Sequence, residues 1–107
     1  MYYIYMLRCK DNSIYTGITV DIDRRMKEHF ERDKKCAKYT LRHQAQKLEA
    51  VWETENRIYA SKLEYYIKTL LKKDKEKLIK NKDLSEFLEN KIDVSKYKVL
   101  KKISNLV

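Results

Sequence analysis

Residues 2–9 limit the possible folds of this chain more than any other feature of its sequence. In an extended chain, neighbouring side chains point to opposite faces. One face would carry Tyr3, Tyr5, Leu7 and Cys9, and the other would carry Tyr2, Ile4 and Met6. Both faces are largely apolar, so each must be covered by another part of the protein. The pattern therefore predicts a central strand of a sheet, with elements packed on both sides.

The next residues predict a hairpin followed by a helix. Lys10-Asp11-Asn12-Ser13 has the composition of a turn, so residues 14–18 should return as a second strand. Two strands joined by such a short turn must be antiparallel. Thr19 or Asp21 can cap a helix whose apolar residues recur every four positions through residue 30.

A third strand is predicted over residues 47–53, after a polar connection at residues 34–46. Simple alternation places Leu48 and Ala50 on the same face as Trp52, with Val51 opposite. A long helix should open at Glu55-Asn56 and run to about Lys73, and Asp74 could cap a shorter helix through Ile79. Residues 94–103 fit a strand or a helix equally well. The predicted fold class is α+β: a small antiparallel sheet flanked by helices.

Charge and composition narrow the classes of partner. The 107 residues include 25 Lys and Arg but only 16 Asp and Glu, a net charge of +9, which favours a polyanion such as nucleic acid. The stretch from Lys72 to Lys82 is either a solvated helical face or a contact for phosphates. No apolar run is long enough to span a bilayer, and the N-terminus lacks a basic leader. We expect a cytoplasmic protein with no membrane partner.

A set of chemically capable residues recurs at regular spacing. Tyr5, Tyr15 and Arg25 are each ten residues apart, in the first strand, the second strand and the following helix. His29 lies four residues after Arg25, so both occupy one helical face. Gly17, the only glycine, marks a place in a strand where a ligand or another backbone can approach closely.

These residues resemble a known family. Tyr3-Ile4-Tyr5, Tyr15-Thr16-Gly17, Arg24-Arg25 and His29 resemble the GIY-YIG nuclease signature, and Lys38-Tyr39-Thr40 and residues 63–68 resemble its later segments. The resemblance is strongest to small stand-alone members and covers about residues 1–80, leaving residues 81–107 as a C-terminal extension that packs on the domain or mediates contacts. It implies a three-stranded antiparallel sheet with flanking helices, and hydrolysis of phosphodiester bonds with one Mg²⁺ or Mn²⁺ ion.

The resemblance also implies roles for individual residues. The implied catalytic residues are Tyr5, Tyr15, Arg25, His29 and Glu64, with Glu64 as the metal ligand. The implied nucleic-acid contacts are Gly17, Arg24, Lys38, Tyr39 and Thr40. Tyr5, Tyr15 and His29 all remain candidates for the general base. Three positions depart from the pattern: Tyr3 replaces the first glycine, Thr16 the second isoleucine, and Ile18 the lysine of the excision-repair members.

Other interpretations of the same residues stay open. Tyr5 and Tyr15 could simply pack across a hairpin, Arg25 could pair with Asp21, and Glu64 could pair with Lys68. The protein could then bind nucleic acid without cutting it. It could also bind another protein through apolar residues of the extension, although these could instead pack on its own core. Those residues are Leu84, Phe87, Leu88, Ile92 and Leu100. Substrate structure, DNA against RNA, pathway and oligomeric state are not determined by the sequence.

Overall fold

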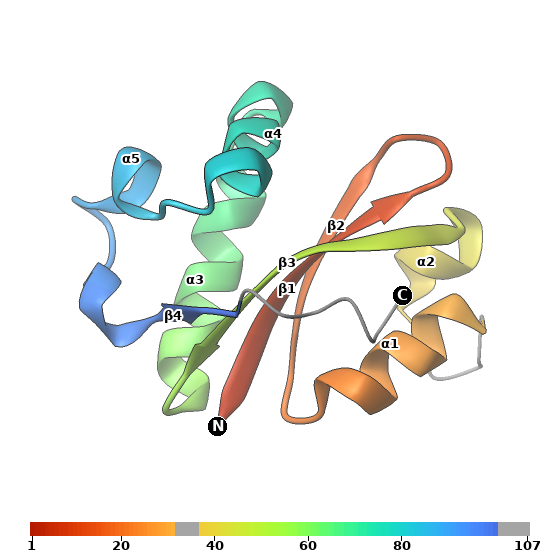
Figure 1. Ribbon diagram of the computed structural model, residues 1–107, viewed down its shortest axis with the longest axis horizontal. Helices are drawn as coiled ribbons and strands as arrows, with labels where there is room; N and C mark the ends of the chain where they lie inside the picture. The colour runs from red at the N-terminus through yellow and green to blue at the C-terminus, as the bar shows by residue number, and fades with distance from the viewer. Residues whose placement is uncertain (32–36, 101–107) are drawn as a thin grey trace.

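The computed structural model describes residues 1–31 and 37–100, which form a four-stranded antiparallel sheet in the order β2-β1-β3-β4, with helices around it. The strands are β1 (Tyr2–Cys9), β2 (Ile14–Thr19), β3 (Ala45–Thr54) and β4 (Lys98–Val99). As predicted, β1 is central: it pairs with β2 on one side and with β3 on the other (Figure 1). The fold class is α+β, as expected. The fourth strand, only two residues long, comes from the C-terminal extension.

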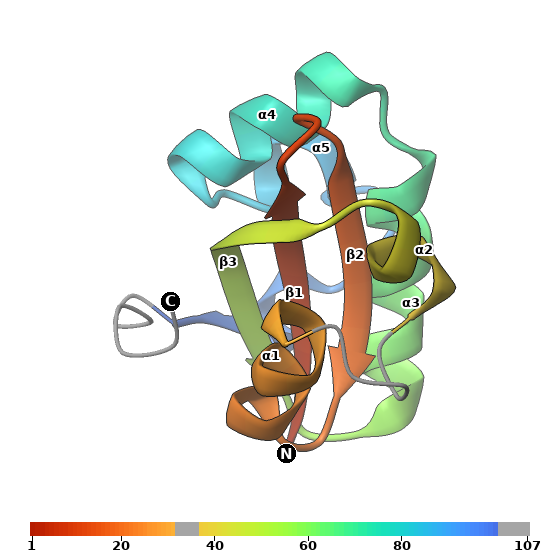
Figure 2. The same ribbon diagram turned by 90° about the vertical axis from the view of Figure 1, so that its right-hand side faces the viewer.

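The two faces of β1 lie in two separate cores. Ile4 and Met6 pack with Trp52 and with the helices α3 (Arg57–Thr69) and α4 (Lys72–Asn81). Tyr5 and Leu7 pack on the other face with α1 (Ile22–Phe30). Figures 1 and 2 show α3 and α4 on one side of the sheet and α1 on the other. The alternation predicted for residues 2–9 is confirmed.

The predicted alternation in β3 is wrong at Leu48. Met6 lies opposite Ala50, but Leu7 lies opposite Leu48, so the register shifts between them at Glu49. An extra residue in one strand reverses the alternation of its side chains beyond that point. Leu48 therefore packs in the core that holds Tyr5, and not in the core with Trp52.

Two of the helix boundaries differ from those expected. Asp21 caps α1 and Asn56 caps α3, as predicted, but α3 ends at Thr69 and not near Lys73. Leu70 and Leu71 are extended, and α4 restarts at Lys72 without a side-chain cap. Because of this break, α4 turns and packs its apolar residues into the core around Trp52. One straight helix would carry those residues past the sheet. A short helix, α2 (Lys38–Arg42), also lies within the region predicted to be a polar connection.

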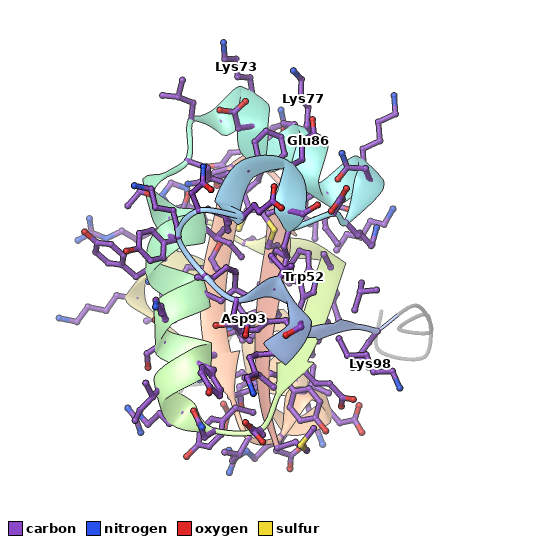
Figure 3. The ribbon with its side chains drawn as sticks, turned by 90° about the vertical axis from the view of Figure 1, so that its left-hand side faces the viewer. Trp52, Lys73, Lys77, Glu86, Asp93 and Lys98 are labelled. Carbon is purple, nitrogen blue, oxygen red and sulfur yellow. The ribbon has the colours of Figure 1, made fainter. Side chains whose placement is uncertain are left out.

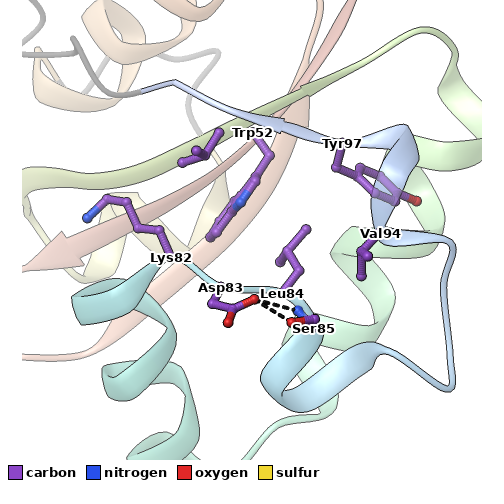
Figure 4. Close-up of a pocket in the computed structure, with 8 residues that line it drawn as sticks. Trp52, Lys82, Asp83, Leu84, Ser85, Val94 and Tyr97 are labelled. Carbon is purple, nitrogen blue, oxygen red and sulfur yellow. Dashed lines mark hydrogen bonds between the residues drawn. The ribbon is translucent and has the colours of Figure 1, made fainter.

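The extension from residue 81 packs around Trp52 with α5 (Ser85–Leu88), the 3-10 helix η1 (Val94–Lys96) and β4. Leu84, Leu88 and Ile92 are buried there. The Tyr97 hydroxyl donates to the carbonyl of Tyr59 at 2.7 Å. Figure 4 shows the shallow pocket between Trp52 and this segment, with the Asp83 carboxylate accepting from Ser85. The sequence of residues 94–103 fitted a strand and a helix equally well, and the last three of these residues, 101–103, lie outside the described residues. The domain boundary at residue 80 stays a prediction.

No helix within residues 1–31 and 37–100 is long and apolar enough to cross a membrane.

Candidate functional site

The hydroxyl of Tyr5 is the centre of a buried polar group on the α1 side of the sheet. Tyr5 has no exposed surface, and its hydroxyl lies 2.8 Å from Nε2 of His29 and 3.4 Å from Nε of Arg25. Arg25 and His29 are one turn apart on α1, so the same helical face directs both toward β1. The structure thus brings together three of the residues that the sequence singled out.

Hydrogen-bond partners determine where the protons of this group lie. The hydroxyl of Thr40 donates its one hydrogen to the carbonyl of Ala37 at 3.1 Å. Its oxygen must therefore accept from Nδ1–H of His29, 2.8 Å away. In the neutral ring, Nε2 is then an acceptor, and it takes the hydroxyl hydrogen of Tyr5. The oxygen of Tyr5 is left to accept from Arg25.

Burial holds Tyr5 and His29 in their neutral forms. It raises the pKa of the Tyr5 hydroxyl well above its ordinary value, although the hydrogen bond from Arg25 opposes the effect. Burial also lowers the pKa of His29 to about 4, and the charge of Arg25 adds to the lowering. At neutral pH, His29 is therefore an unprotonated acceptor and Tyr5 an intact hydroxyl donor.

Tyr15, on β2, adjoins the same group. Its ring centroid lies 6.1 Å from that of Tyr5 and 5.5 Å from that of His29. Tyr39 of α2 stacks on Tyr15 with centroids 5.5 Å apart and also stacks on His43, which pairs with Asp11 in the β1–β2 turn. This ladder of rings ties α2 to the hairpin and holds Tyr15 in place.

Gly17 has a packing role between the two tyrosines. Tyr5 lies opposite Gly17 in the hairpin, and a Cβ at Gly17 would lie 2.5 Å from the Tyr5 hydroxyl oxygen and 3.0 Å from the ring of Tyr15. The Tyr5 ring occupies the space above the glycine. The close approach expected at this position is thus made by a side chain of the protein, and a contact of Gly17 with nucleic acid stays a prediction.

Glu64 reaches the site from α3, which packs along β2. Its side chain is 24% exposed, and its negative charge helps to raise the pKa of Tyr5, so it lies within electrostatic range of that hydroxyl. It also pairs with Lys68 at 3.4 Å, one turn away, as the structural interpretation of the sequence suggested. The Lys68 ammonium lies 5.8 Å from the Tyr15 ring centroid, so this ion pair borders the site.

Residues 1–81, which include Tyr5, Tyr15, Arg25, His29 and Glu64, match a family model described as the GIY-YIG catalytic domain. The chain belongs to the GIY-YIG family. It is 43% identical over 100 residues to a UPF0213 protein of Fusobacterium nucleatum, covering 94% of this chain and 96% of that one. It is 42% identical over 78 residues to a UPF0213 protein of Halalkalibacterium halodurans, covering 73% and 81%. The solution NMR structure of a UPF0213 protein from Bacillus halodurans is 38% identical, covers 75% and 84% of the two chains, and superposes with a TM-score of 0.47.

The other residues of the GIY-YIG signature differ in whether they contact the polar group around Tyr5. Thr40 is buried as the partner of His29, and Tyr39 packs on Tyr15. Arg24 and Lys38 are exposed, and within the described residues no hydrogen bond joins either to the polar group around Tyr5. The alternative interpretation, an ion pair of Arg25 with Asp21, is wrong: Asp21 caps α1, and Arg25 pairs with Glu28 at 2.9 Å. The i,i+3 spacing of Arg25 and Glu28 was a readable signal for that pair.

Glu64 is a carboxylate beside the site that could hold a divalent cation. The part of the chain that the structure describes contains no cluster of three or more His, Cys, Asp or Glu side chains that could enclose a metal ion. Mg²⁺ does not need such a cluster, because it keeps several waters and is often held by one or two carboxylates together with a substrate phosphate. The partly exposed carboxylate of Glu64 fits that role.

Proposed function

We propose that this protein is a metal-dependent nuclease that hydrolyses phosphodiester bonds in nucleic acid, with DNA as its substrate. One observation carries the proposal: the Tyr5 hydroxyl lies between the neutral ring of His29 and the guanidinium of Arg25, beside Tyr15 and within electrostatic range of Glu64. A protein that only binds nucleic acid has no need of a buried proton-transfer group or of a carboxylate beside phosphate. DNA repair, recombination and DNA degradation in the cytoplasm are processes that such an enzyme would serve.

Arg25 is the residue we assign to the phosphate. Hydrolysis places additional negative charge on the phosphate oxygens, and a guanidinium offers them a permanent charge and a rigid fork of donors. Glu28 holds one end of this guanidinium at 2.9 Å, and Tyr5 lies at its Nε. These contacts orient the fork before substrate arrives. A divalent ion held by Glu64 and the substrate would stabilise the charge that develops on the leaving oxygen.

Buried His29 can act on water only through another residue. It has no exposed surface, and its Nε2 already accepts the hydrogen of Tyr5. If Tyr5 takes the proton of the attacking water, its own proton passes to His29, and the negative phosphate beside Arg25 offsets the new charge on the imidazole. Tyr15 is the alternative acceptor, because it is half-buried and adjoins the same group. Tyr5 has no exposed surface either, so Tyr15 is the member of this group most open to an attacking water. Tyr5, Tyr15 and His29 all stay candidates for the general base.

The test separates cutting from binding. Wild type, Glu64→Ala and the control Glu89→Ala would be incubated with labelled single-stranded, nicked, duplex and branched DNA and with RNA, in Mg²⁺, Mn²⁺ or EDTA. Glu89 is exposed beyond α5, so its replacement changes the net charge equally. We expect Glu64→Ala to lose metal-dependent cleavage and to bind DNA as well as wild type or slightly better, because a carboxylate near phosphates repels them until a cation bridges the two.

Cleavage by Glu64→Ala at the wild-type rate would remove the nuclease proposal. Binding by wild type without cleavage of any substrate would favour the alternative, a catalytically silent nucleic-acid-binding module.

A further inference from the structure

A second basic site lies beside the polar group around Tyr5, where β2, α1 and α3 meet. In Figure 2 the end of β2, the start of α1 and the start of α3 lie together at the lower end of the sheet. The structure has a pocket there, which we call the arginine pocket. It is lined by Tyr2, Ile18, Thr19, Val20, Arg24, Arg25, Glu28 and Arg57.

Charge in the arginine pocket is unbalanced. Three arginines line it against one carboxylate, and that carboxylate, Glu28, already pairs with Arg25. Arg24 and Arg57 are exposed, and across residues 1–31 and 37–100 no carboxylate lies within ion-pair distance of either. They come from different helices, so the fold, and not local sequence, brings them together. Two arginines without acidic partners in one hollow favour an anion, and the guanidinium fork suits phosphate.

Arg25 connects the arginine pocket to the reacting group. Its Nε faces the Tyr5 hydroxyl, and its Nη1 contacts Glu28 in the pocket wall. The same guanidinium therefore borders both places, and an anion in the pocket would lie next to one held beside Tyr5. The lining also includes the apolar side chains of Ile18 and Val20 and the ring of Tyr2, which can contact a sugar or base.

We propose that the arginine pocket binds a backbone phosphate of the nucleic-acid strand, adjoining the phosphate beside Tyr5, through Arg24 and Arg57. This inference rests on the proposed function. It identifies the segment of substrate that positions the strand before the chemical step. Phosphate contacts of this kind set register and carry little sequence information.

The lysines of α4 lack these features. Figure 3 shows Lys73 and Lys77 extending outward from the helix. Both are exposed, and neither lines the arginine pocket. A long solvated side chain loses rotamer freedom when it holds a ligand, so such lysines add less to binding than a formed pocket does.

The experiment measures binding alone, without cleavage. Fluorescence anisotropy of a short labelled single-stranded DNA in EDTA would be recorded over a salt series for wild type, Arg57→Ala, Arg24→Ala and a control, Lys98→Ala. Lys98 is exposed on β4, at the opposite edge of the sheet from β2, so the control removes the same charge far from the pocket. Circular dichroism would check that each variant is folded.

We expect each pocket variant to weaken binding by about tenfold, the size of one hydrogen bond to a charged group. Loss of the phosphate contact should also lower the slope of log K against log salt by about 0.7 for a single strand. Lys98→Ala should change both quantities much less. Equal effects of the pocket variants and Lys98→Ala would show a general effect of charge and refute the arginine pocket.

The binding and cleavage measurements together can refute the arginine pocket and the nuclease proposal separately. Wild type that cleaves DNA while Arg57→Ala keeps the full salt slope would refute the pocket and leave the enzyme assignment intact. Loss of slope in a protein that never cleaves would support the pocket and count against the nuclease.

Discussion

Mild acid should destabilise this protein through His29. The folded state lowers the pKa of this histidine from 6.5 to about 4, mainly because the ring is buried. In the unfolded chain the ring takes up a proton below about pH 6.5, whereas in the folded protein it stays neutral down to about pH 4. The unfolded state therefore binds more protons across this window, and stability falls as pH falls from 6.5 towards 4.

The size of the effect follows from the two pKa values. The full change corresponds to about 3 kcal/mol, since each pKa unit is worth about 1.4 kcal/mol. Most of it falls in an accessible range: between pH 7 and pH 5 the loss should reach about 2 kcal/mol. That is a large fraction of the roughly 5–15 kcal/mol that stabilises a typical domain.

Urea unfolding of wild type and His29→Gln at several pH values would measure this loss of stability in mild acid. The variant loses the hydrogen bonds to Tyr5 and Thr40, so it should be less stable at pH 7. Its disadvantage should shrink by about 2 kcal/mol by pH 5, because it has no ring to protonate. The other ionisable groups are the same in both proteins, so their effects largely cancel in the difference. A constant difference from pH 7 to pH 5 would refute the argument.

A second measurement does not depend on the variant being folded. The ring carbon resonances of His29 in wild type, followed by NMR, should show no protonation between pH 7 and pH 5. Protonation with a midpoint near 6.5 would show that burial does not hold the ring neutral.

Three further substitutions test the site. Gly17→Ala should cost about 1–3 kcal/mol in urea unfolding, because the new methyl group overlaps the Tyr5 ring, and an unchanged midpoint would contradict the packing. Arg25→Lys should lower the cleavage rate by about 10²–10³-fold while binding weakens less, because the charge is kept and the fork oriented by Glu28 is lost; equal losses in rate and affinity would argue against a role in the transition state. Tyr15→Phe keeps the stacked ring, so stability should change by less than about 0.5 kcal/mol while the rate falls by about 10²-fold or more, and an unaltered rate would exclude its hydroxyl from the chemistry.

Most of the sheet was predictable because its signals are local. The two apolar faces of residues 2–9 required a central strand, and the turn at residues 10–13 required an antiparallel partner. Asp21 and Asn56 marked helix starts, because their side chains accept hydrogen bonds from backbone N–H groups three residues on. The family resemblance over about residues 1–80 agrees with the matched domain at residues 1–81.

The errors lie where distant contacts override local pattern. Nothing around Glu49 in the sequence announces the shift of register that moves Leu48 to the other face, because a bulge is defined only by pairing with β1. The break after Thr69 likewise depends on apolar residues of α4 finding the Trp52 core.

The sequence by itself was enough to select the candidate site residues: Tyr5, Tyr15, Arg25, His29 and Glu64 all follow from residue type, spacing and family resemblance. Their catalytic roles stay predictions.

Only the tertiary structure decided how these residues act on one another. The proton position on His29 depends on Thr40, eleven residues away, and the neutral state of Tyr5 depends on burial by the whole core. The arginine pocket combines two helices that are far apart in the chain. The physical reason is that side-chain type and helical spacing are properties of a local segment, whereas desolvation and hydrogen-bond partners depend on which segments the fold brings together.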